Sequence, residues 1–245
     1  MSKKQATSLA RAAALAALAM AAACTDDGES MRIVQNQIPA EGCTISANAS
    51  DAFRPRGIIQ SDSSVGYVFT PVIQSLLVVA TNRPDVQRVV SVRGADIDVT
   101  FPDGFFSADE EAELRDDALT RFSSPFSGTL LAGKTLSVSF EILPAELLRR
   151  VDALLGPDEA VQASAEIVAF GDTNGGEVES IPFTYPVTIC SDCLTIDYGD
   201  CATLAESDLP DGPYGNACNT QGYQDGDVPC CTLNGQDVCP ADPGA

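Results

Sequence analysis

The sequence of 245 residues contains no histidine and no tryptophan. Histidine is the usual general base near neutral pH and a common metal ligand, so its absence excludes Ser-His-Asp and Cys-His catalysis and histidine-bound zinc or iron. Basic residues are also scarce, since 14 Lys and Arg stand against 35 Asp and Glu and none follows Arg150. Such an acidic chain repels nucleic acid, so we expect no nucleic-acid partner.

Long apolar runs are absent except at the start of the chain. Lys3, Lys4 and Arg11 precede an uninterrupted apolar run from Ala12 to Ala23. A basic start followed by about 7–15 apolar residues is typical of a secretory signal peptide. The run is shorter than the roughly 20 residues that a membrane-spanning helix needs. Residues 1–23 are therefore predicted to be a signal peptide, and no transmembrane helix is expected.

Cys24 follows three alanines, an arrangement that resembles the lipoprotein box of bacteria, in which small residues precede a lipidated cysteine. The departure is Ala21, where that box usually has Leu, Val or Ile, and the alternative is ordinary cleavage and free secretion. Lipidation of Cys24 leaves eight of the nine cysteines, an even number that disulfides can pair completely. We predict a lipid anchor at Cys24 and a polar tether over 24–30. Thr25, where an inner-membrane signal would have Asp, favours the outer membrane.

Alternating apolar residues predict a mainly β domain over residues 31–189. The clearest alternation lies in Val161–Ile167 and Ile181–Ile189, as expected of strands with one buried face. In Val86–Phe101 the apolar positions change parity across Arg93-Gly94, which predicts a β-bulge there. Regularly spaced strands with turn signals between them predict an antiparallel, immunoglobulin-like β-sandwich.

Other segments of this domain have their own local predictions. Val65–Ala80 is predicted as strand from its aromatic and β-branched content, with a helix as the alternative. Residues 144–155 are predicted to form one short amphipathic helix, because their leucines and Val151 share one helical face. Two prolines in the strand Ile181–Ile189 predict that it lies at a sheet edge.

Gly128–Thr135 matches the phosphate-binding pattern G-x-x-x-x-G-K-[ST]. That pattern binds phosphate when a buried strand precedes it and a helix follows it. Here the alternating residues from Leu136 to Ile142 predict a strand, so we interpret the segment as a hairpin turn through 132–134. No nucleotide partner is expected.

Residues 190–245 form a cysteine-rich C-terminal segment, predicted to be irregular and held by disulfides because it contains little that could form a core. The cysteines predicted to form disulfides are Cys43, Cys190, Cys193, Cys201, Cys218, Cys230, Cys231 and Cys239. Their pairing cannot be deduced from spacing. Since Cys43 alone lies outside this segment, at least one bridge should link the segment to the β domain. The adjacent Cys230 and Cys231 should have different partners.

Three specific functions are alternatives to purely structural disulfides and turns: redox activity, zinc binding and calcium binding. Cys190 and Cys193 match the C-x-x-C redox pattern, but extended residues flank them where a helix is required. Zinc bound by four thiolates needs a second C-x-x-C pair, which Cys230-Cys231 does not supply. Calcium is the remaining cofactor candidate, although the acidic residues do not fit the twelve-residue calcium loop. These calcium candidates are Asp197, Asp200, Asp225 and Asp227.

A resemblance to uncharacterised envelope lipoproteins of myxobacteria is carried by the leader and by four later stretches. These stretches are Arg32–Pro39, Gly66–Pro71, Phe183–Cys190 and Pro229–Cys239. The resemblance covers most of the chain after the leader. It implies an exported, lipid-anchored protein, and it implies no activity and no site residues.

Together these observations predict a non-catalytic lipoprotein of the cell envelope with a structural or protein-interaction role. Its expected partners are the membrane, through the lipid, and other envelope proteins. Two alternatives stay open, a calcium-assisted adhesin and a hydrolase that works with carboxylates alone, as glycosidases do. Two carboxylates that converge in a concave pocket would favour the hydrolase.

Overall fold

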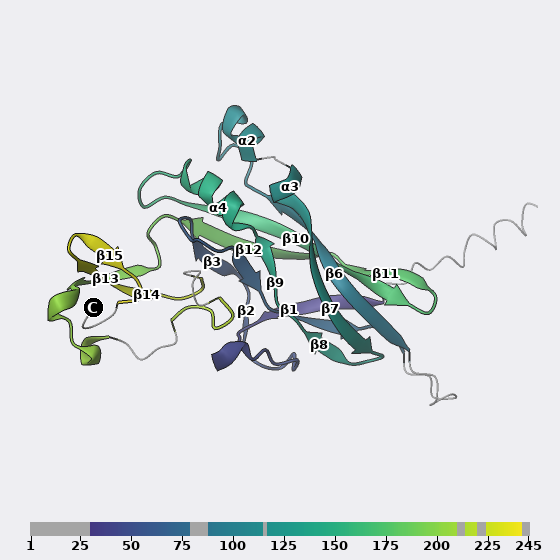
Figure 1. The fold of residues 1–245 in the computed structure, drawn as a ribbon. Coiled ribbons are helices and arrows are strands. Elements are labelled where there is room, and N and C mark those ends of the chain that lie inside the picture. The colour runs from purple at the N-terminus through teal and green to yellow at the C-terminus, as the bar shows by residue number, and fades with distance from the viewer. Residues whose placement is uncertain (1–29, 79–87, 115–116, 210–213, 220–223, 242–245) are drawn as a thin grey trace, which may run out of the picture.

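The computed structural model describes residues 30–78, 88–114, 117–209, 214–219 and 224–241. Within these ranges the chain is mainly β, as predicted (Figure 1). The predicted signal peptide, Cys24 and most of the predicted tether lie outside the described residues. So do the last two residues of the strand segment predicted to end at Ala80. No helix in the described part of the chain is long and apolar enough to cross a membrane.

The described ranges of the β domain and the C-terminal segment contain fifteen strands. The strands are β1 (Met31–Gln37), β2 (Phe53–Arg54), β3 (Gly57–Gln60), β4 (Tyr67–Phe69), β5 (Pro71–Ser75), β6 (Val89–Thr100), β7 (Arg121–Leu131), β8 (Thr135–Ser137), β9 (Phe140–Leu143), β10 (Ala160–Thr173), β11 (Gly176–Ile181), β12 (Phe183–Cys190), β13 (Thr195–Asp200), β14 (Val228–Leu233) and β15 (Gln236–Val238). The α-helices are α2 (Ala108–Leu114), α3 (Asp117–Thr120) and α4 (Ala145–Asp152). Three short 3₁₀ helices are η2 (Glu41–Cys43), η3 (Cys201–Thr203) and η4 (Glu206–Asp208).

One ten-stranded sheet is organised around the long strand β10. On one side β10 pairs with β6 along most of its length. On its other side the first half of β10 pairs with β12, and the last four residues pair with β11. One branch of the sheet therefore runs β7-β6-β10-β12-β3, and the other continues from β11 through β1 and β5 to β8. β4 and β9 form a separate two-stranded ladder.

The sheet is mixed, which corrects the prediction of an antiparallel arrangement. β1 runs parallel to β11, and β3 runs parallel to β12. Both parallel pairs join strands that are far apart in the sequence, and parallel neighbours need such long connections. The alternation of side chains along a strand shows which face is buried, but it contains no information on the direction of the neighbouring strand. The alternation of apolar residues therefore could not predict whether neighbouring strands run parallel or antiparallel.

The β-bulge predicted at Arg93-Gly94 is confirmed. The register between β6 and β7 shifts between Val92 and Gly94, and the register between β6 and β10 shifts at the same place. Val90 and Val92 are buried before the shift, and Ile97 and Val99 after it. The extra residue at the bulge lets both parts of a twelve-residue strand bury their apolar side chains on the same face.

Several other local predictions are confirmed. The described part of the segment predicted as strand over Val65–Ala80, residues 65–78, contains strands β4 and β5 and no helix. The predicted amphipathic helix is α4, which ends at Asp152, three residues earlier than expected, and buries Leu147, Leu148 and Val151.

Gly128–Thr135 joins two strands, but its turn does not close a hairpin, because β8 pairs with β5 and β7 pairs with β6. The hairpin interpretation was wrong on that point.

The prediction that β12 lies at a sheet edge is only half correct. β3 pairs with β12 from Val187 to Cys190, so that half of β12 is internal. Pro182 and Pro186 precede this paired half, where the absence of an N–H group removes no hydrogen bond to β3. The prolines therefore mark where the pairing begins and do not mark an edge along the whole strand.

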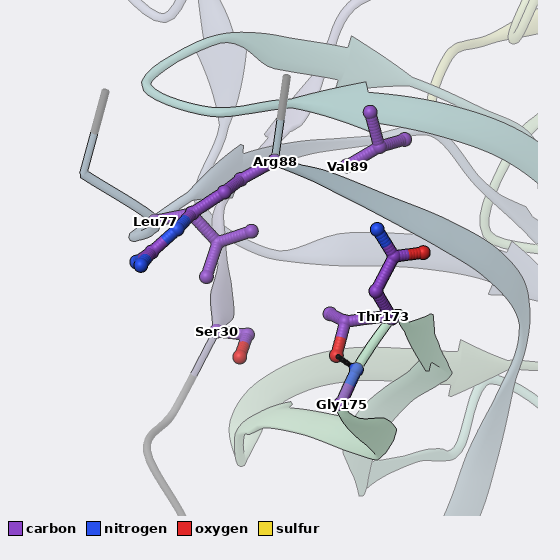
Figure 2. Close-up of a pocket in the computed structure, with 7 residues that line it drawn as sticks. Ser30, Leu77, Arg88, Val89, Thr173 and Gly175 are labelled. Atoms are coloured by element: carbon purple, nitrogen blue, oxygen red, sulfur yellow. Dashed lines mark hydrogen bonds between the residues drawn. The ribbon is translucent and has the colours of Figure 1, made fainter. Parts of the chain in front are cut away.

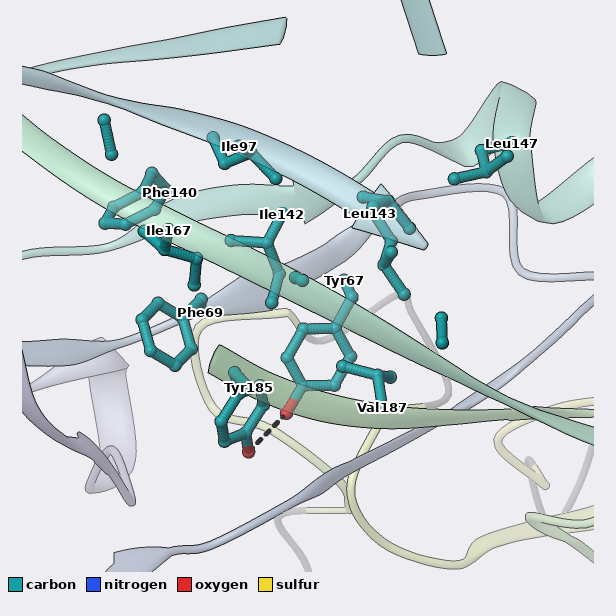
Figure 3. Close-up of a cluster of buried hydrophobic side chains, with 14 of the residues drawn as sticks. Tyr67, Phe69, Ile97, Phe140, Ile142, Leu143, Leu147, Ile167, Tyr185 and Val187 are labelled. Atoms are coloured by element: carbon teal, nitrogen blue, oxygen red, sulfur yellow. Dashed lines mark hydrogen bonds between the residues drawn. The ribbon is translucent and has the colours of Figure 1, made fainter. Parts of the chain in front are cut away.

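The hydrophobic core is continuous and includes residues from both branches of the sheet, with Met31 and Ile73 on the second branch. Figure 3 shows the part of this core that is formed by β4, β6, β9, β10, β12 and α4. Phe69 is fully buried, with its ring centroid 4.8 Å from that of Tyr185 and 5.7 Å from that of Phe140. Leu147 on α4 is also fully buried and belongs to the same cluster. Each fully buried side chain of this size stabilises the fold by about 1.5–3 kcal/mol. The helix thus adds to the core, as its sequence predicted.

The C-terminal segment is less irregular than its composition suggests. β13, β14 and β15 form a small sheet of their own, with β13 parallel to β14. A second, minor core contains Cys201 and Cys231. All eight cysteines assigned to disulfides are paired, and Cys230 and Cys231 have different partners, as predicted. The bridges are Cys43–Cys218, Cys190–Cys193, Cys201–Cys231 and Cys230–Cys239.

Cys43–Cys218 is the bridge that ties the C-terminal segment to the β domain, across 175 residues. We expect Cys43→Ser combined with Cys218→Ser to lower the free energy of unfolding by about 5 kcal/mol, because the bridge closes a long loop in the unfolded chain. The matched control is Cys190→Ser with Cys193→Ser, which opens a loop of only three residues. That control should cost about 2 kcal/mol. Urea unfolding of both variants measures the difference, and equal losses would contradict the loop argument.

Candidate functional site

The candidate site lies where the C-terminal segment meets the sheet. It has two parts: a buried polar network around Asp225, and a hollow lined by Asp62, Asp192 and Asp197. The first part holds the segment in place. The second is a concave surface with several carboxylates, which is the kind of feature that binds or transforms ligands.

Gln224 and Asp225 continue the sheet beyond its edge strand β3. The Asp225 N–H donates to the carbonyl of Ile58 at 2.9 Å, and the Ile58 N–H donates to Oδ1 of Asp225 at 3.0 Å. Ile59 and Gln224 form an antiparallel bridge. The C-terminal segment therefore covers the edge of β3, whose backbone groups would otherwise be open to a foreign strand.

Side-chain amides extend this contact to β4. The Gln224 side chain accepts from the Val68 N–H at 2.9 Å and donates to the Val68 carbonyl at 2.7 Å. Asn219 donates to the Gly66 carbonyl at 2.8 Å. Gln224 and Asn219 are both buried. Because these amides satisfy buried backbone groups as a strand would, they fix the position of the segment as well as stabilising it.

A chain of side-chain hydrogen bonds runs from Asn36 to Asp225. The Tyr67 hydroxyl donates to Oδ2 of Asp225 at 2.9 Å, and Asn36 donates to the Tyr185 hydroxyl at 2.6 Å. The hydroxyl oxygens of Tyr67 and Tyr185 lie 3.2 Å apart, and the dashed line in Figure 3 marks this hydrogen bond. Since each phenol has one hydrogen and that of Tyr67 goes to Asp225, Tyr185 donates to Tyr67. Every hydroxyl in the chain therefore has both a donor and an acceptor role.

Burial controls the charge state of this network. Loss of solvent raises the pKa of Tyr67 well above its ordinary value and that of Tyr185 to about 12, so both stay protonated donors. Burial also raises the pKa of Asp225, although the Arg54 guanidinium, with its Nε 3.5 Å from Oδ2, opposes the shift. Only 1% of the Asp225 side chain is exposed. Its carboxylate is therefore tolerated because Arg54 and three protein donors surround it.

The hollow has a volume of about 320 Å³ and lies between β3 and the C-terminal sheet. Asp62 follows β3, Asp192 lies within the C-x-x-C turn, and Asp197 lies on β13. The residues that complete the lining are Gln60, Thr195, Cys230 and Cys239. Partial burial raises the pKa of Asp62, and the negative charges of Asp192 and Asp152 raise it further, against a hydrogen bond from Gln60. Asp62 is thus a carboxyl group that holds its proton more firmly than usual.

The structure does not bring the four calcium candidates together. Asp197 lines the hollow and accepts from the Gly199 N–H, whereas Asp200 accepts from the Ala202 N–H at the start of η3. Asp225 belongs to the buried network, and Asp227 is exposed. Across the described ranges, no three acidic or cysteine side chains lie close enough to hold a metal ion. Calcium binding stays a prediction.

The structure also bears on the redox and zinc interpretations of the cysteines. Cys190 and Cys193 form a disulfide at the end of β12 and are followed by strand β13, so the helix that a redox C-x-x-C motif requires does not come next. Cys230 and Cys231 are each bonded to another cysteine, which leaves no thiolate of that pair for zinc.

Sequence reasoning did not identify Asp62, Tyr67, Asn219 or Gln224 as site residues. Tyr67 and Asp225 are 158 positions apart, and Asn219 and Gly66 are 153 apart. No local pattern indicates such a contact. The one signal available was cysteine arithmetic, which required Cys43 to meet the C-terminal segment somewhere on the β domain.

Two further hollows lie elsewhere on the β domain. One, of about 400 Å³, contains the ion pair of Asp98 and Arg121 beside Phe101 and Phe106. The other, of about 290 Å³, is lined mostly by apolar surface and lies near Ser30. Figure 2 shows Leu77 and Arg88 on one side of this hollow and Thr173 and Gly175 on the other.

Comparison with known proteins adds no relative to this description. No protein-family model matches the sequence, and no curated protein matches it either.

The buried network makes a prediction about stability. We expect Asp225→Ala to lower the free energy of unfolding by about 1–3 kcal/mol, because it leaves the Ile58 N–H without its partner and the Arg54 guanidinium without its carboxylate. Asp227→Ala is the matched control, two residues away but exposed, and should change stability by less than about 0.5 kcal/mol. Denaturant unfolding measures both variants. Equal effects would show that the network does not hold the segment.

Proposed function

We propose that the chain is a lipid-anchored protein of the bacterial cell envelope that acts in structure or protein interaction and not in catalysis. The outer membrane is favoured over the inner membrane as its location. The observation that carries the proposal is the completed pairing of eight cysteines. Four disulfides place the folded chain in an oxidising compartment outside the cytoplasm. They also leave Cys24 as the one cysteine with no partner among the other eight, as a lipid-bearing residue would be.

An interaction role is supported by the way in which the C-terminal segment is held. A disulfide, a continued sheet edge and buried amides fix it to the β domain. Preorganised surfaces bind partners at a low entropic cost, because their side chains are already ordered. We further propose that the two branches of the sheet form an immunoglobulin-like sandwich, an architecture found in many binding modules. One core cluster that includes residues of both branches supports this arrangement.

The anchor is tested by metabolic labelling. Cells that express the protein are grown with a radioactive fatty acid, and the protein is then isolated under denaturing conditions. We expect label on the wild-type chain and none on Cys24→Ala, because only the thiol at position 24 accepts lipid. Cys43→Ser serves as the matched control and should keep its label. Label on Cys24→Ala would overturn the anchored assignment, and an unlabelled wild-type chain would favour free secretion.

A carboxylate-based hydrolase is the second candidate, because one observation favours it. Asp62, Asp192 and Asp197 line a single hollow, and the raised pKa of Asp62 suits a general acid. Glycoside hydrolysis needs only two such carboxyl groups, one protonated and one ionised. Asp192 or Asp197 would then supply the second carboxyl group.

Enzyme assays separate the two candidates. Under the leading proposal, wild-type protein and Asp62→Asn release product from a panel of chromogenic glycosides at the same background rate. Removal of a general acid from a hydrolase instead costs about 100-fold or more in rate. Asp158→Asn is the control, since Asp158 is exposed and its positive φ of 59° suits Asn. Activity that Asp62→Asn abolishes and Asp158→Asn retains would overturn the non-catalytic assignment.

A further inference from the structure

The end of the sheet around Ser30 differs from the rest of the molecule in its exposed side chains. Four of the large hydrophobic residues with substantial exposure lie there, and Val78, at 75%, is the most exposed of them. Basic residues that are also exposed accompany them. We call this the Ser30 surface, and its members are Arg32, Leu76, Val78, Arg88, Leu131, Lys134 and Ile181.

Backbone contacts place these residues together. Leu76 donates its N–H to the Ser30 carbonyl at 2.9 Å, and Ser75 donates to the Lys134 carbonyl at 2.9 Å. Leu131 is the register partner of Val89 in the ladder between β6 and β7.

Two more contacts complete the surface. Arg32 is opposite Ile181 in the parallel pair of β1 and β11. Arg88 and Leu77 line the hollow near Ser30, as Figure 2 shows.

The local charge contrasts with that of the whole chain. Among the described residues near this end, Arg32, Arg88, Arg93 and Lys134 stand against three carboxylates, Asp172, Glu177 and Glu179. The tether before Ser30 adds the acidic residues Asp26, Asp27 and Glu29 to the sequence. Arg93 forms ion pairs with Asp172 and Glu177. The chain from residue 24 onward carries a net charge of −24, so a slight excess of cations among the described residues of this surface is unusual for it. Cations beside exposed aliphatic side chains suit a surface of anionic phospholipid headgroups.

The position of the anchor points to the same partner. Ser30 is six residues after Cys24, and six residues span at most about 20 Å when fully extended. A lipid on Cys24 would therefore hold the Ser30 surface within reach of the bilayer.

The opposite end of β10 lies beside the cysteine-rich segment, since Ala160 pairs with Cys190. That segment carries no basic residue, so an anionic membrane repels it. The position of the anchor and the distribution of charge thus favour the same orientation of the β domain on the membrane.

We infer that the Ser30 surface is the membrane-facing side of the protein and contacts anionic phospholipid headgroups directly, with the cysteine-rich segment directed away from the bilayer. The inference rests on the proposed lipid anchor and goes beyond it. A lipid at Cys24 could hold the domain in any orientation on a loose tether, whereas direct contact fixes which end of the β domain meets the membrane and which end meets partners.

The absence of tryptophan from the chain makes a direct test available. Val78→Trp and Phe53→Trp each introduce the only indole, at exposed positions on the Ser30 surface and on β2 respectively. The lipidated proteins are reconstituted into vesicles of zwitterionic and anionic phospholipid that carry brominated acyl chains. We expect several-fold stronger quenching of the indole at position 78 than at position 53, and more in anionic than in zwitterionic vesicles.

Charge reversal and sedimentation make the outcomes distinguishable. Arg88→Glu in the Val78→Trp protein should abolish the extra quenching in anionic vesicles, whereas Arg56→Glu, an equal charge change at an exposed site off this surface, should not. Protein that fails to sediment with vesicles overturns the anchor and this orientation with it. Protein that sediments but shows equal quenching at positions 53 and 78 overturns the orientation alone.

Discussion

The buried carboxylate of Asp225 is the contact on which the relation between the two parts of the molecule depends. It accepts hydrogen bonds from a strand backbone and from a tyrosine, and it forms an ion pair with Arg54. A buried charge with any of these partners missing is costly, so the group is tolerated only when the whole arrangement forms. This makes docking of the C-terminal segment close to all-or-none. The hydrophobic core contributes most of the stabilisation of the β domain, but it does not specify where that segment must lie.

The same contact also covers an open edge of the sheet. β3 is a short strand at the end of one branch, and an uncovered edge is a template for association with other chains. The C-terminal segment covers it with a short antiparallel bridge and with the side chain of Gln224, which satisfies both backbone groups of Val68 on the neighbouring β4. The C-terminal segment has too few apolar residues for a large core of its own. It therefore attaches to the β domain through polar groups, and its disulfides compensate for the small amount of apolar surface that it buries.

Local patterns were sufficient for the strands predicted in the β domain, the bulge and helix α4. They were insufficient for the strands of the C-terminal segment, which was predicted to be irregular, and for the assembly of the fold. The parity change at Arg93-Gly94 and the apolar face of α4 are properties of neighbouring residues, so they could be predicted. The parallel pairing of β3 with β12 and the docking of Asp225 join distant parts of the chain, and alternation contains no record of such partners. Cysteine parity was the one long-range signal. It predicted that Cys43 would meet the C-terminal segment, but it did not indicate that acidic residues such as Asp62 would gather at the junction.

The Cys43–Cys218 bridge also determines how the molecule would carry mechanical load. If a partner pulls on the C-terminal end while lipid holds Cys24, tension passes along the chain to Cys43 and crosses directly to Cys218. The 174 residues between them form a closed covalent loop outside this path. Within the β domain, β1 is the one strand in the line of force, and its pairing with β5 and β11 resists extraction. Most of the hydrophobic core would therefore stay folded under a force that acts on both ends of the protein.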